Sequence, residues 1–416
     1  MSTTTISNKP VTDAPTIGSN VRGYVERVRG GDMGALPAVF GLIVLCTVFA
    51  ILRPAFLTAI NFANLFTQGA GVTMIAMGLV FVLLLGEIDL SAGFASGVCA
   101  AVLATTLANH GQPWYIAVAA AILTGVVIGA VLGALVAKLG IPSFVVTLAA
   151  FLAFQGLVLL LVNDGTNIAV RDQTILSIEN QNLPPALGWA LYIGCVVIYA
   201  AVQIVRARRR AGRGLSVDPA TVIAFRVGLL AVIGGLAVYA LNVERSRNAL
   251  IVSLKGVPIV VPIVVALLVF WTFVLRRTAF GRHIYAVGGN AEAARRAGIS
   301  VDRIRISAFV ICSTMAAIGG IIAASRDNSV DPNTGGSNVL LFAVGAAVIG
   351  GTSLFGGKGR VIDAVLGGAV VAVINNGMGL MGYSASVKFV VTGSVLLLAA
   401  GVDALSRKRA AASGLR

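Results

Sequence analysis

Two carboxylates in an otherwise apolar region are the residues of this sequence best placed to do chemistry. Glu87 and Asp89 lie in the segment GEIDLSAG, with Ser91 beside them. Paired carboxylates can act as general acid and base, or pass protons along a polar path. A carboxylate at mid-bilayer depth costs roughly 2.5 to 3.5 kcal/mol on insertion scales, so each one needs a compensating partner.

The same segment also has a structural interpretation. Its glycines favour a re-entrant break between two helices, and carboxylates there can accept hydrogen bonds from free N–H groups at the start of the next helix, Ser91 to Ala108. We favour this capping role over a role in a pathway for solute or protons. A broken helix beside a translocation path would serve both.

Two side-chain amides, Asn375 and Asn376, fall within another apolar span and need hydrogen-bond partners there. We expect bonds between helices in preference to contact with solute. The predicted residues of a translocation path or helix break are Glu87, Asp89, Ser91, Asn375 and Asn376.

Nucleotide and metal sites are not predicted. The stretch GGTSLFGGKGR invites comparison with a phosphate-binding loop, G-x-x-x-x-G-K-[ST], but Thr352 replaces the first glycine and Gly359 replaces the final Ser or Thr. The two histidines and four cysteines are dispersed, so we expect no metal site, disulfide framework or cofactor on this chain. If ATP drives transport here, it must bind another subunit.

Membrane-spanning helices must position these residues. Of 416 residues, 57% are hydrophobic and 11% charged, and the mean hydropathy is +0.94, which is too apolar for a soluble globule. Apolar runs long enough to cross a core roughly 30 Å thick predict an all-α polytopic membrane protein of about 10–12 transmembrane helices. The predicted spans are 37–52, 62–86, 88–108, 114–137, 143–162, 187–205, 222–241, 257–275, 306–324, 339–350, 361–381 and 385–404.

The basic residues behind the net charge of +15 are distributed according to membrane topology. Threading these spans with the N-terminus inside places 24 of the 31 Lys and Arg residues on one side, which predicts that both termini are cytoplasmic. Nucleic-acid binding is therefore not expected. We divide the chain into a flexible cytoplasmic tail (1–34), a transmembrane domain (35–405) and a basic cytoplasmic tail (406–416).

The longest polar loop between spans predicts a short helix with well-defined ends. Asn290 can cap its start, Glu292 lies in the first turn, Arg295 and Arg296 lie in the last turn, and Gly298 can end it. A helix of about two turns is marginal alone. We therefore expect it to dock against its own bundle or against a partner.

Four motifs carry a family resemblance. They are GEIDLSAG at 86–93, FGRHIYAVGGNAEAARRAGI at 280–299, AVIGGTSLFGGKGR at 347–360 and INNGMGLMG at 374–382. In this order and spacing they resemble the permease subunits of bacterial ABC monosaccharide importers, the ribose and xylose family. The chain is longer in its middle than the ribose-type members, which is similar to the xylose-type branch.

The resemblance implies a non-enzymatic permease that moves a monosaccharide, a pentose such as xylose, across the bacterial inner membrane. It implies a homodimeric pore in membrane lipid, an ATP-binding subunit that holds ATP and Mg, and a periplasmic sugar-binding protein. The segment that matches the family's coupling helix to the ATPase contains Gly289, Asn290, Glu292, Ala293, Ala294, Arg295 and Gly298.

Other functions remain open at this point. A proton-coupled secondary sugar transporter would use Glu87 and Asp89, but leaves the loop helix unexplained. An intramembrane enzyme lacks any further catalytic pairing. Among ABC permeases, branched-chain amino acids and nucleosides remain possible substrates.

Overall fold

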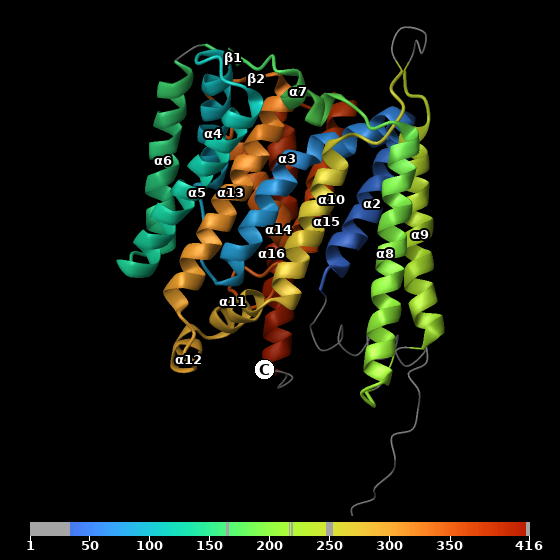
Figure 1. The fold of residues 1–416 in the computed structure, drawn as a ribbon. Coiled ribbons are helices and arrows are strands. Elements are labelled where there is room, and N and C mark those ends of the chain that lie inside the picture. Colours follow the sequence, from blue (N-terminus) through green and yellow to red (C-terminus); the bar gives the residue numbers. More distant parts are fainter. Residues whose placement is uncertain (1–33, 164–165, 216, 218, 247–252, 413–416) are drawn as a thin grey trace, which may run out of the picture. The chain divides into compact units, whose positions relative to one another are not determined.

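The protein is built almost entirely from helices (Figure 1). The computed structural model describes residues 34–163, 166–215, 217, 219–246 and 253–412. The helices before the middle of the chain are α2 (Leu36–Leu52), η1 (Pro54–Leu57), α3 (Ala59–Leu84), α4 (Ala92–Ala108), α5 (Trp114–Lys138), α6 (Ser143–Val162), α7 (Gln173–Asn180) and α8 (Pro185–Ala211). Those after it are α9 (Ala220–Asn242), α10 (Val260–Arg277), α11 (Ala279–Gly289), α12 (Ala291–Arg296), α13 (Val301–Asp327), α14 (Ser337–Ile349), α15 (Val361–Leu380) and α16 (Ala385–Ala412).

Every predicted span coincides with an apolar helix. Among the described residues, eight helices are long and apolar enough to cross a membrane, namely α3, α5, α6, α8, α9, α10, α13 and α15. Shorter apolar helices lie within α2, α4, α14 and α16. The prediction of an all-α polytopic membrane protein is confirmed. The 13 residues of α14 rise only about 20 Å, so this helix does not cross the hydrocarbon core by itself.

The chain forms two compact units, which are described separately. The larger contains Gly34–Pro184 and Leu241–Leu405, and the smaller contains, among the described residues, Pro185–Ala240 and the end of the chain from Ser406. In the smaller unit, the Tyr192 hydroxyl of α8 donates to the Ala231 carbonyl of α9. Residues 1–33 and 413–416 of the predicted tails lie outside the described residues, and α16 continues as a helix to Ala412.

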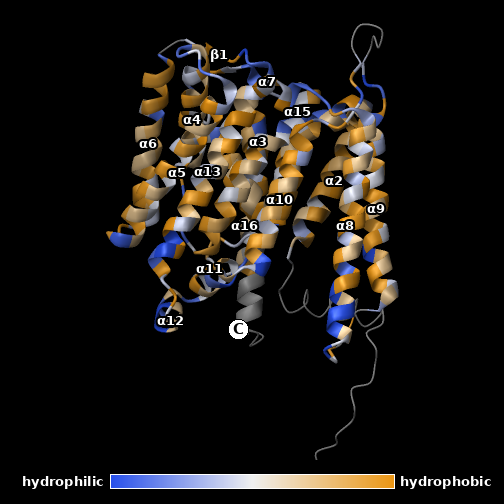
Figure 2. Ribbon diagram, viewed as in Figure 1, coloured by the Kyte–Doolittle hydropathy of each residue, from blue (hydrophilic) through white to orange (hydrophobic). Residues whose placement is uncertain are grey.

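The core of the larger unit surrounds α3, α13 and α15, whose side chains are the most deeply buried among its long helices. Met74 and Phe81 of α3 and Phe309 and Met315 of α13 are fully buried. Apolar residues cover the length of the bundle, and polar residues gather at its two ends (Figure 2). Such a distribution is expected of helices that traverse a lipid core.

Close packing joins α5 to α13. Gly125, Gly129 and Gly133 recur every fourth residue on one face of α5, and a Cβ on any of them would lie 2.4 to 2.7 Å from backbone atoms of α13. Small residues at this spacing let two helices approach until their backbones touch. The interface fixes α13 laterally along much of its length.

Helix α13 runs between the two ends of the larger unit (Figure 1). It begins just after α12, and we call that end the α12 end. It finishes beside α7 and the two-stranded sheet of β1 (Ile168–Ala169) and β2 (Ser329–Val330), which are antiparallel with Ile168 opposite Val330. We call this the α7 end. A single helix thus connects the surfaces at which the candidate residues lie.

Candidate functional site

The predicted short helix is present at the α12 end. The Asn290 side chain accepts from the Ala293 N–H at 2.9 Å, and Glu292 pairs with Arg295 at 3.2 Å and Arg296 at 3.4 Å. Gly298 follows with φ +82°, a conformation that favours glycine. The predicted N-cap, charge order and stop signal of α12 are confirmed.

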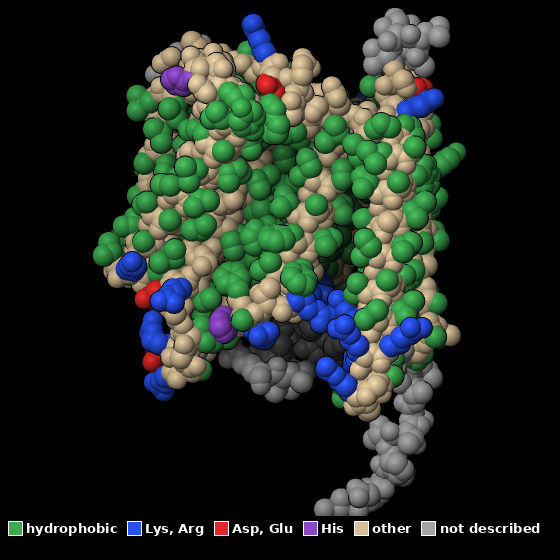
Figure 3. Space-filling view, in the orientation of Figure 1, with side chains coloured by type: hydrophobic (Ala, Val, Ile, Leu, Met, Phe, Trp, Pro, Cys, Tyr) green, Lys and Arg blue, Asp and Glu red, His purple; other side chains and the backbone are tan. Residues whose placement is uncertain are grey.

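This helix presents a polar face to its surroundings. The side chains of Glu292, Arg295 and Arg296 are 59%, 58% and 79% exposed, and Figure 3 shows charged side chains gathered at this end. Gly289, Asn290, Ala293 and Gly298 are also exposed. Ala294, in contrast, is only 5% exposed and packs into the chain's own core. Ala294 therefore anchors α12, and the other predicted coupling residues are free to meet a partner surface.

The preceding helix, α11, was not predicted, because its residues belong to the same polar loop as α12 in the sequence. Thr278 caps it by accepting from the Gly281 N–H at 3.2 Å. A signal was present, because Phe280, Ile284 and Val287 recur at helical spacing and pack toward the core. The α12 end is thus a helical platform, α11 and α12, leading into α13.

Glu87 lies in the turn between α3 and α4 and pairs with Arg305 near the start of α13. Its Oε1 is 3.0 Å from Arg305 Nε, and the two side chains are 14% and 27% exposed. Arg305 Nε makes no hydrogen bond within the described part of the chain, so the attraction is mainly that of the two charges. The Gly357 N–H also donates to the Leu84 carbonyl at 2.8 Å, which ties the loop before α15 to the same turn.

Asp89 is 1% exposed and organises the start of α4. Its Oδ1 accepts from the backbone N–H of Ser91 at 2.9 Å and from the Ser91 hydroxyl at 2.7 Å. The Cys312 side chain of α13 lies against the same carboxylate. Asp89 therefore has a structural role as expected, but it orders the N-cap residue Ser91, and α4 itself has no side-chain cap among the described residues. Glu87 is compensated by an ion pair and does not cap the helix.

Replacing Asp89 with Ala should destabilise the protein by roughly 1 to 3 kcal/mol, because Ser91 loses both bonds in a buried place. Thermal unfolding of the purified protein in detergent measures this. Asp302→Ala is the control, since Asp302 is an exposed carboxylate in the first turn of α13. Equal melting temperatures for the two variants would contradict a structural role for Asp89.

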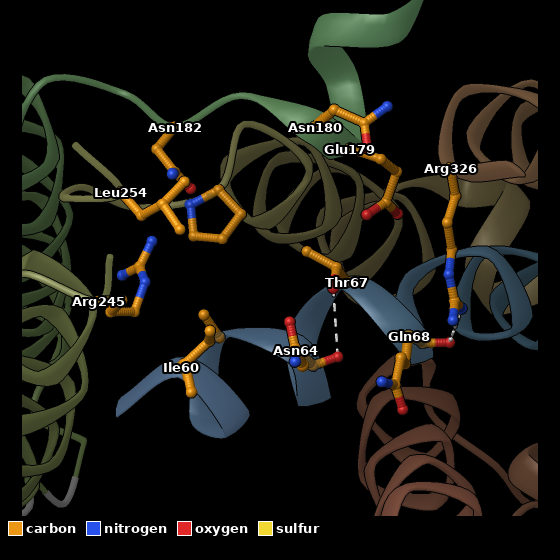
Figure 4. A pocket seen from close by; sticks show the side chains of 12 residues that line it. Ile60, Asn64, Thr67, Gln68, Glu179, Asn180, Asn182, Arg245, Leu254 and Arg326 are labelled. Carbon is orange, nitrogen blue, oxygen red and sulfur yellow. Dashed lines mark hydrogen bonds between the residues drawn. The ribbon is translucent and has the colours of Figure 1, made fainter. Parts of the chain in front are cut away.

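Three adjoining cavities lie toward the α7 end, and all of them are bordered by Gln68 of α3 and Arg326 of α13. Their volumes are about 360, 250 and 380 Å³, each near the range of small-molecule pockets, about 300 to 1,000 Å³. The first is shown in Figure 4. Because the cavities share lining residues, they form one depression among α3, α13 and α15, with polar side chains from each of these helices on its walls.

The predicted amides Asn375 and Asn376 line this depression. The Asn376 Nδ2 donates to Gln68 Oε1 at 3.2 Å, so the expected bond between helices is present. Its Oδ1 is buried with no hydrogen-bond partner among the described residues, and Asn375 borders two cavities. Lys388 of α16 borders the third. The structure therefore separates the predicted path residues into a group at the α7 end and a group (Glu87, Asp89 and Ser91) nearer the α12 end.

Several cavity residues were missed. On α3, Asn61, Asn64 and Gln68 are spaced three and four residues apart in an apolar helix, and such a polar stripe predicts a wetted face. That signal was available. The cavity role of Glu179 and Arg326 had no such signal, because α7 and the end of α13 meet only through tertiary packing.

Glu179, on α7, is a buried carboxylate. The residue is 7% exposed, and neither carboxylate oxygen has a hydrogen-bond partner in the described part of the chain. Burial is the largest influence and raises the pKa of Glu179 to about 8, while Arg326 lowers it and Asp327 raises it. Arg245 is the other charged residue that borders the cavity.

The stability of the protein should fall as pH rises from about 5 to about 8, through the pKa of Glu179. The folded pKa lies above the usual value of 4.5, so the favourable contribution is complete below that value and is lost as the carboxyl ionises. A shift of one pKa unit corresponds to about 1.4 kcal/mol, so the size of the pKa shift of Glu179 limits how much stability this one group can contribute. Glu179→Gln should flatten the melting temperature across this range, and an unchanged slope would contradict it.

Comparison with known proteins places the chain in a family. The profile described as "Branched-chain amino acid transport system / permease component" matches residues 61–400. The xylose transport system permease protein of Escherichia coli strain K12 is 36% identical over 356 residues, which are 85% of this chain and 87% of that protein. Its counterpart in Haemophilus influenzae is 32% identical over 85% of this chain and 92% of that protein.

The ribose import permease protein of Bacillus subtilis strain 168 is 30% identical over 382 residues, which are 92% of this chain and 95% of that protein. No solved structure matches the chain. The family profile covers most of the chain, and these relatives align over nearly their whole lengths. The chain therefore belongs to the family of branched-chain amino acid transport system permease components, and its similarity to xylose and ribose permeases confirms the resemblance seen in its motifs.

Proposed function

We propose that this chain is the membrane-spanning permease subunit of an ATP-driven importer that moves a monosaccharide, a pentose such as xylose, across the bacterial inner membrane. The observation that carries the substrate class is the 36% identity to a xylose permease over 85% of the chain. The depression at the α7 end supports it, because amide side chains on its walls suit a neutral polyhydroxylated solute.

The proposed route of coupling is α13. Its first turns follow the exposed helix α12, and its end carries Arg326, which borders all three cavities. Movement of α12 by a partner would therefore be transmitted along a packed helix to the cavity walls. On this proposal the α12 end is cytoplasmic, both termini are cytoplasmic, and α12 seats on an ATP-binding subunit.

The remaining partners follow from the same proposal. The ATP-binding subunit supplies ATP and Mg, since this sequence lacks a complete phosphate-binding motif. A periplasmic sugar-binding protein delivers solute at the α7 end. A second copy of the permease completes the pore within the lipid bilayer.

A proton-coupled secondary transporter is not favoured. Glu87 is held by Arg305 and Asp89 by Ser91, so both carboxylates have structural partners. The relatives are subunits of transport systems and import permeases by name. The alternative needs Glu87 or Asp89 to carry protons, and these contacts give both residues structural roles instead.

The substrate is tested by uptake in cells that express the whole operon, compared with cells in which only this permease is deleted. Labelled D-xylose, D-ribose and L-leucine are supplied separately, because the family profile and the similar relatives point to different substrates. We expect saturable pentose uptake that needs the permease. Permease-dependent uptake of leucine and of neither sugar would overturn the proposed substrate.

A further inference from the structure

Hydrogen bonds between α7 and α13 hold the backbone of Glu179 in place. Its backbone N–H donates to the Ser325 hydroxyl of α13 at 3.1 Å, and the neighbouring Asn180 amide donates to the Ser325 carbonyl at 2.8 Å. The Ser325 hydroxyl in turn donates to the Leu176 carbonyl at 3.3 Å. The last turn of α7 is therefore fastened to the end of α13, and the position of the carboxylate is fixed by both helices.

The carboxylate points into the cavity. Figure 4 shows it directed toward Thr67 of α3, with the Arg326 side chain beside it reaching toward Gln68. Arg326 donates to the Gln68 carbonyl at 3.3 Å, while Arg245 on the opposite wall is engaged by the carbonyls of Leu241 and Gly256. Within the described part of the chain Glu179 is thus a carboxyl group without a hydrogen-bond partner, in a cavity that amide and guanidinium side chains also line.

This combination selects a class of ligand. A cation would be repelled by the two arginines, and an anion would have to compete for guanidinium groups that already donate to backbone carbonyls. A neutral molecule with neighbouring hydroxyl groups can both donate to and accept from the Glu179 carboxyl group, which is largely protonated near neutral pH, while its other oxygens accept from Arg326 and the amides. The cavity of about 360 Å³ is large enough for a small ring of this kind.

We propose that Glu179, with Asn64, Gln68 and Arg326, forms a binding station for a neutral polyhydroxylated molecule at the α7 end of the permease. This inference rests on the proposed sugar import and names residues that recognise the sugar on this chain itself. Glu179 forms hydrogen bonds with the hydroxyl groups of the bound molecule. Arg326 contacts the same molecule and belongs to α13, the helix proposed to move during transport.

The position of Glu179 is costly for folding, which is a second reason to assign it to a ligand. Buried carboxylates without partners destabilise a protein, and an apolar residue of similar size removes that penalty. The raised pKa of Glu179, about 8, reflects the same burial. A residue kept only for packing would gain from replacement by Leu, whereas a residue that binds solute would lose transport while the protein became more stable.

The test uses the complete importer, with its ATP-binding subunit and sugar-binding protein, in proteoliposomes. Initial uptake of D-xylose and of a deoxy-xylose lacking one hydroxyl is measured for wild type, Glu179→Leu, Glu179→Gln and the control Asp172→Asn. Asp172 caps the start of the same helix, and its side chain does not border the cavity. Melting temperatures are recorded alongside.

We expect Glu179→Leu to lower the initial rate of D-xylose uptake, divided by the sugar concentration, by about tenfold or more. Its melting temperature should be equal to that of wild type or higher. The preference for D-xylose over the deoxy sugar should shrink in both Glu179 variants, and less in Glu179→Gln because one acceptor remains. Asp172→Asn should behave as wild type. If Glu179→Leu does not fold, the preference ratio of Glu179→Gln decides.

Unchanged D-xylose uptake and an unchanged preference ratio in the Glu179 variants would overturn the binding station. A loss of uptake with the preference ratio preserved would also overturn it, since that pattern indicates a structural role. These outcomes are distinct from failure of the proposed function, in which the wild-type importer moves neither sugar.

Discussion

Uptake of the transported sugar should be lost when Glu292→Lys and Gly298→Arg are combined in α12. The first change places a third positive charge beside Arg295 and Arg296 on an exposed face. The second puts a side chain at φ +82°, which costs about 1–2 kcal/mol. Because docking surfaces depend on a few residues, we expect uptake to fall by more than about 100-fold.

The measurement combines uptake with co-purification of the ATP-binding subunit. We expect that subunit to be absent from the purified variant while the permease still inserts in normal amount. The matched control is Gly111→Arg with Gln112→Lys, which also combines a positive-φ glycine with a new exposed charge, at the turn between α4 and α5. Normal co-purification with the α12 variant would show that docking lies elsewhere.

Glu87→Arg should reduce uptake by about tenfold or more without releasing the ATP-binding subunit. This change sets two positive charges against each other at the start of α13, where Glu87 and Arg305 are 3.0 Å apart. Exposed pairs contribute about 0.2–1 kcal/mol, and breaking a buried pair costs about 3–5 kcal/mol. The Glu87–Arg305 pair is partly buried, so we expect the cost of breaking it to lie between those limits.

Exchange of the two charges separates coupling from simple damage. In Glu87→Arg with Arg305→Glu the attraction is restored with reversed sign, so uptake should recover to a substantial fraction of wild type. Each single variant should retain the ATP-binding subunit. A double variant no better than the worse single variant would contradict a functional ion pair and leave the two residues independent.

Features set by local sequence were predictable. The spans followed from runs of apolar residues, and α12 followed from Asn290, Glu292 and Gly298, each of which acts within its own turn. The structural role of Asp89 was also predictable, because its partner Ser91 is only two residues away. The predicted bond between Asn376 and another helix was correct in kind, although the identity of Gln68 as its acceptor was not predictable from one span.

Features set by contact between distant segments were not predictable in the same way. Glu87 and Arg305 are far apart in sequence, and their pairing depends on how the α3–α4 turn meets α13. The burial of Glu179 depends on Ser325. No local pattern encodes either contact. The stripe of Asn61, Asn64 and Gln68 on α3 is different, since its spacing alone indicated a polar face.

The measurement that most directly tests the central claim is the energy source of uptake. Cells expressing the whole operon take up labelled D-xylose after treatment with a protonophore, or separately with an agent that depletes ATP while the proton gradient is maintained. An ATP-driven permease predicts that uptake survives the protonophore and stops on ATP depletion. Uptake that collapses with the proton gradient while ATP stays high would contradict the account.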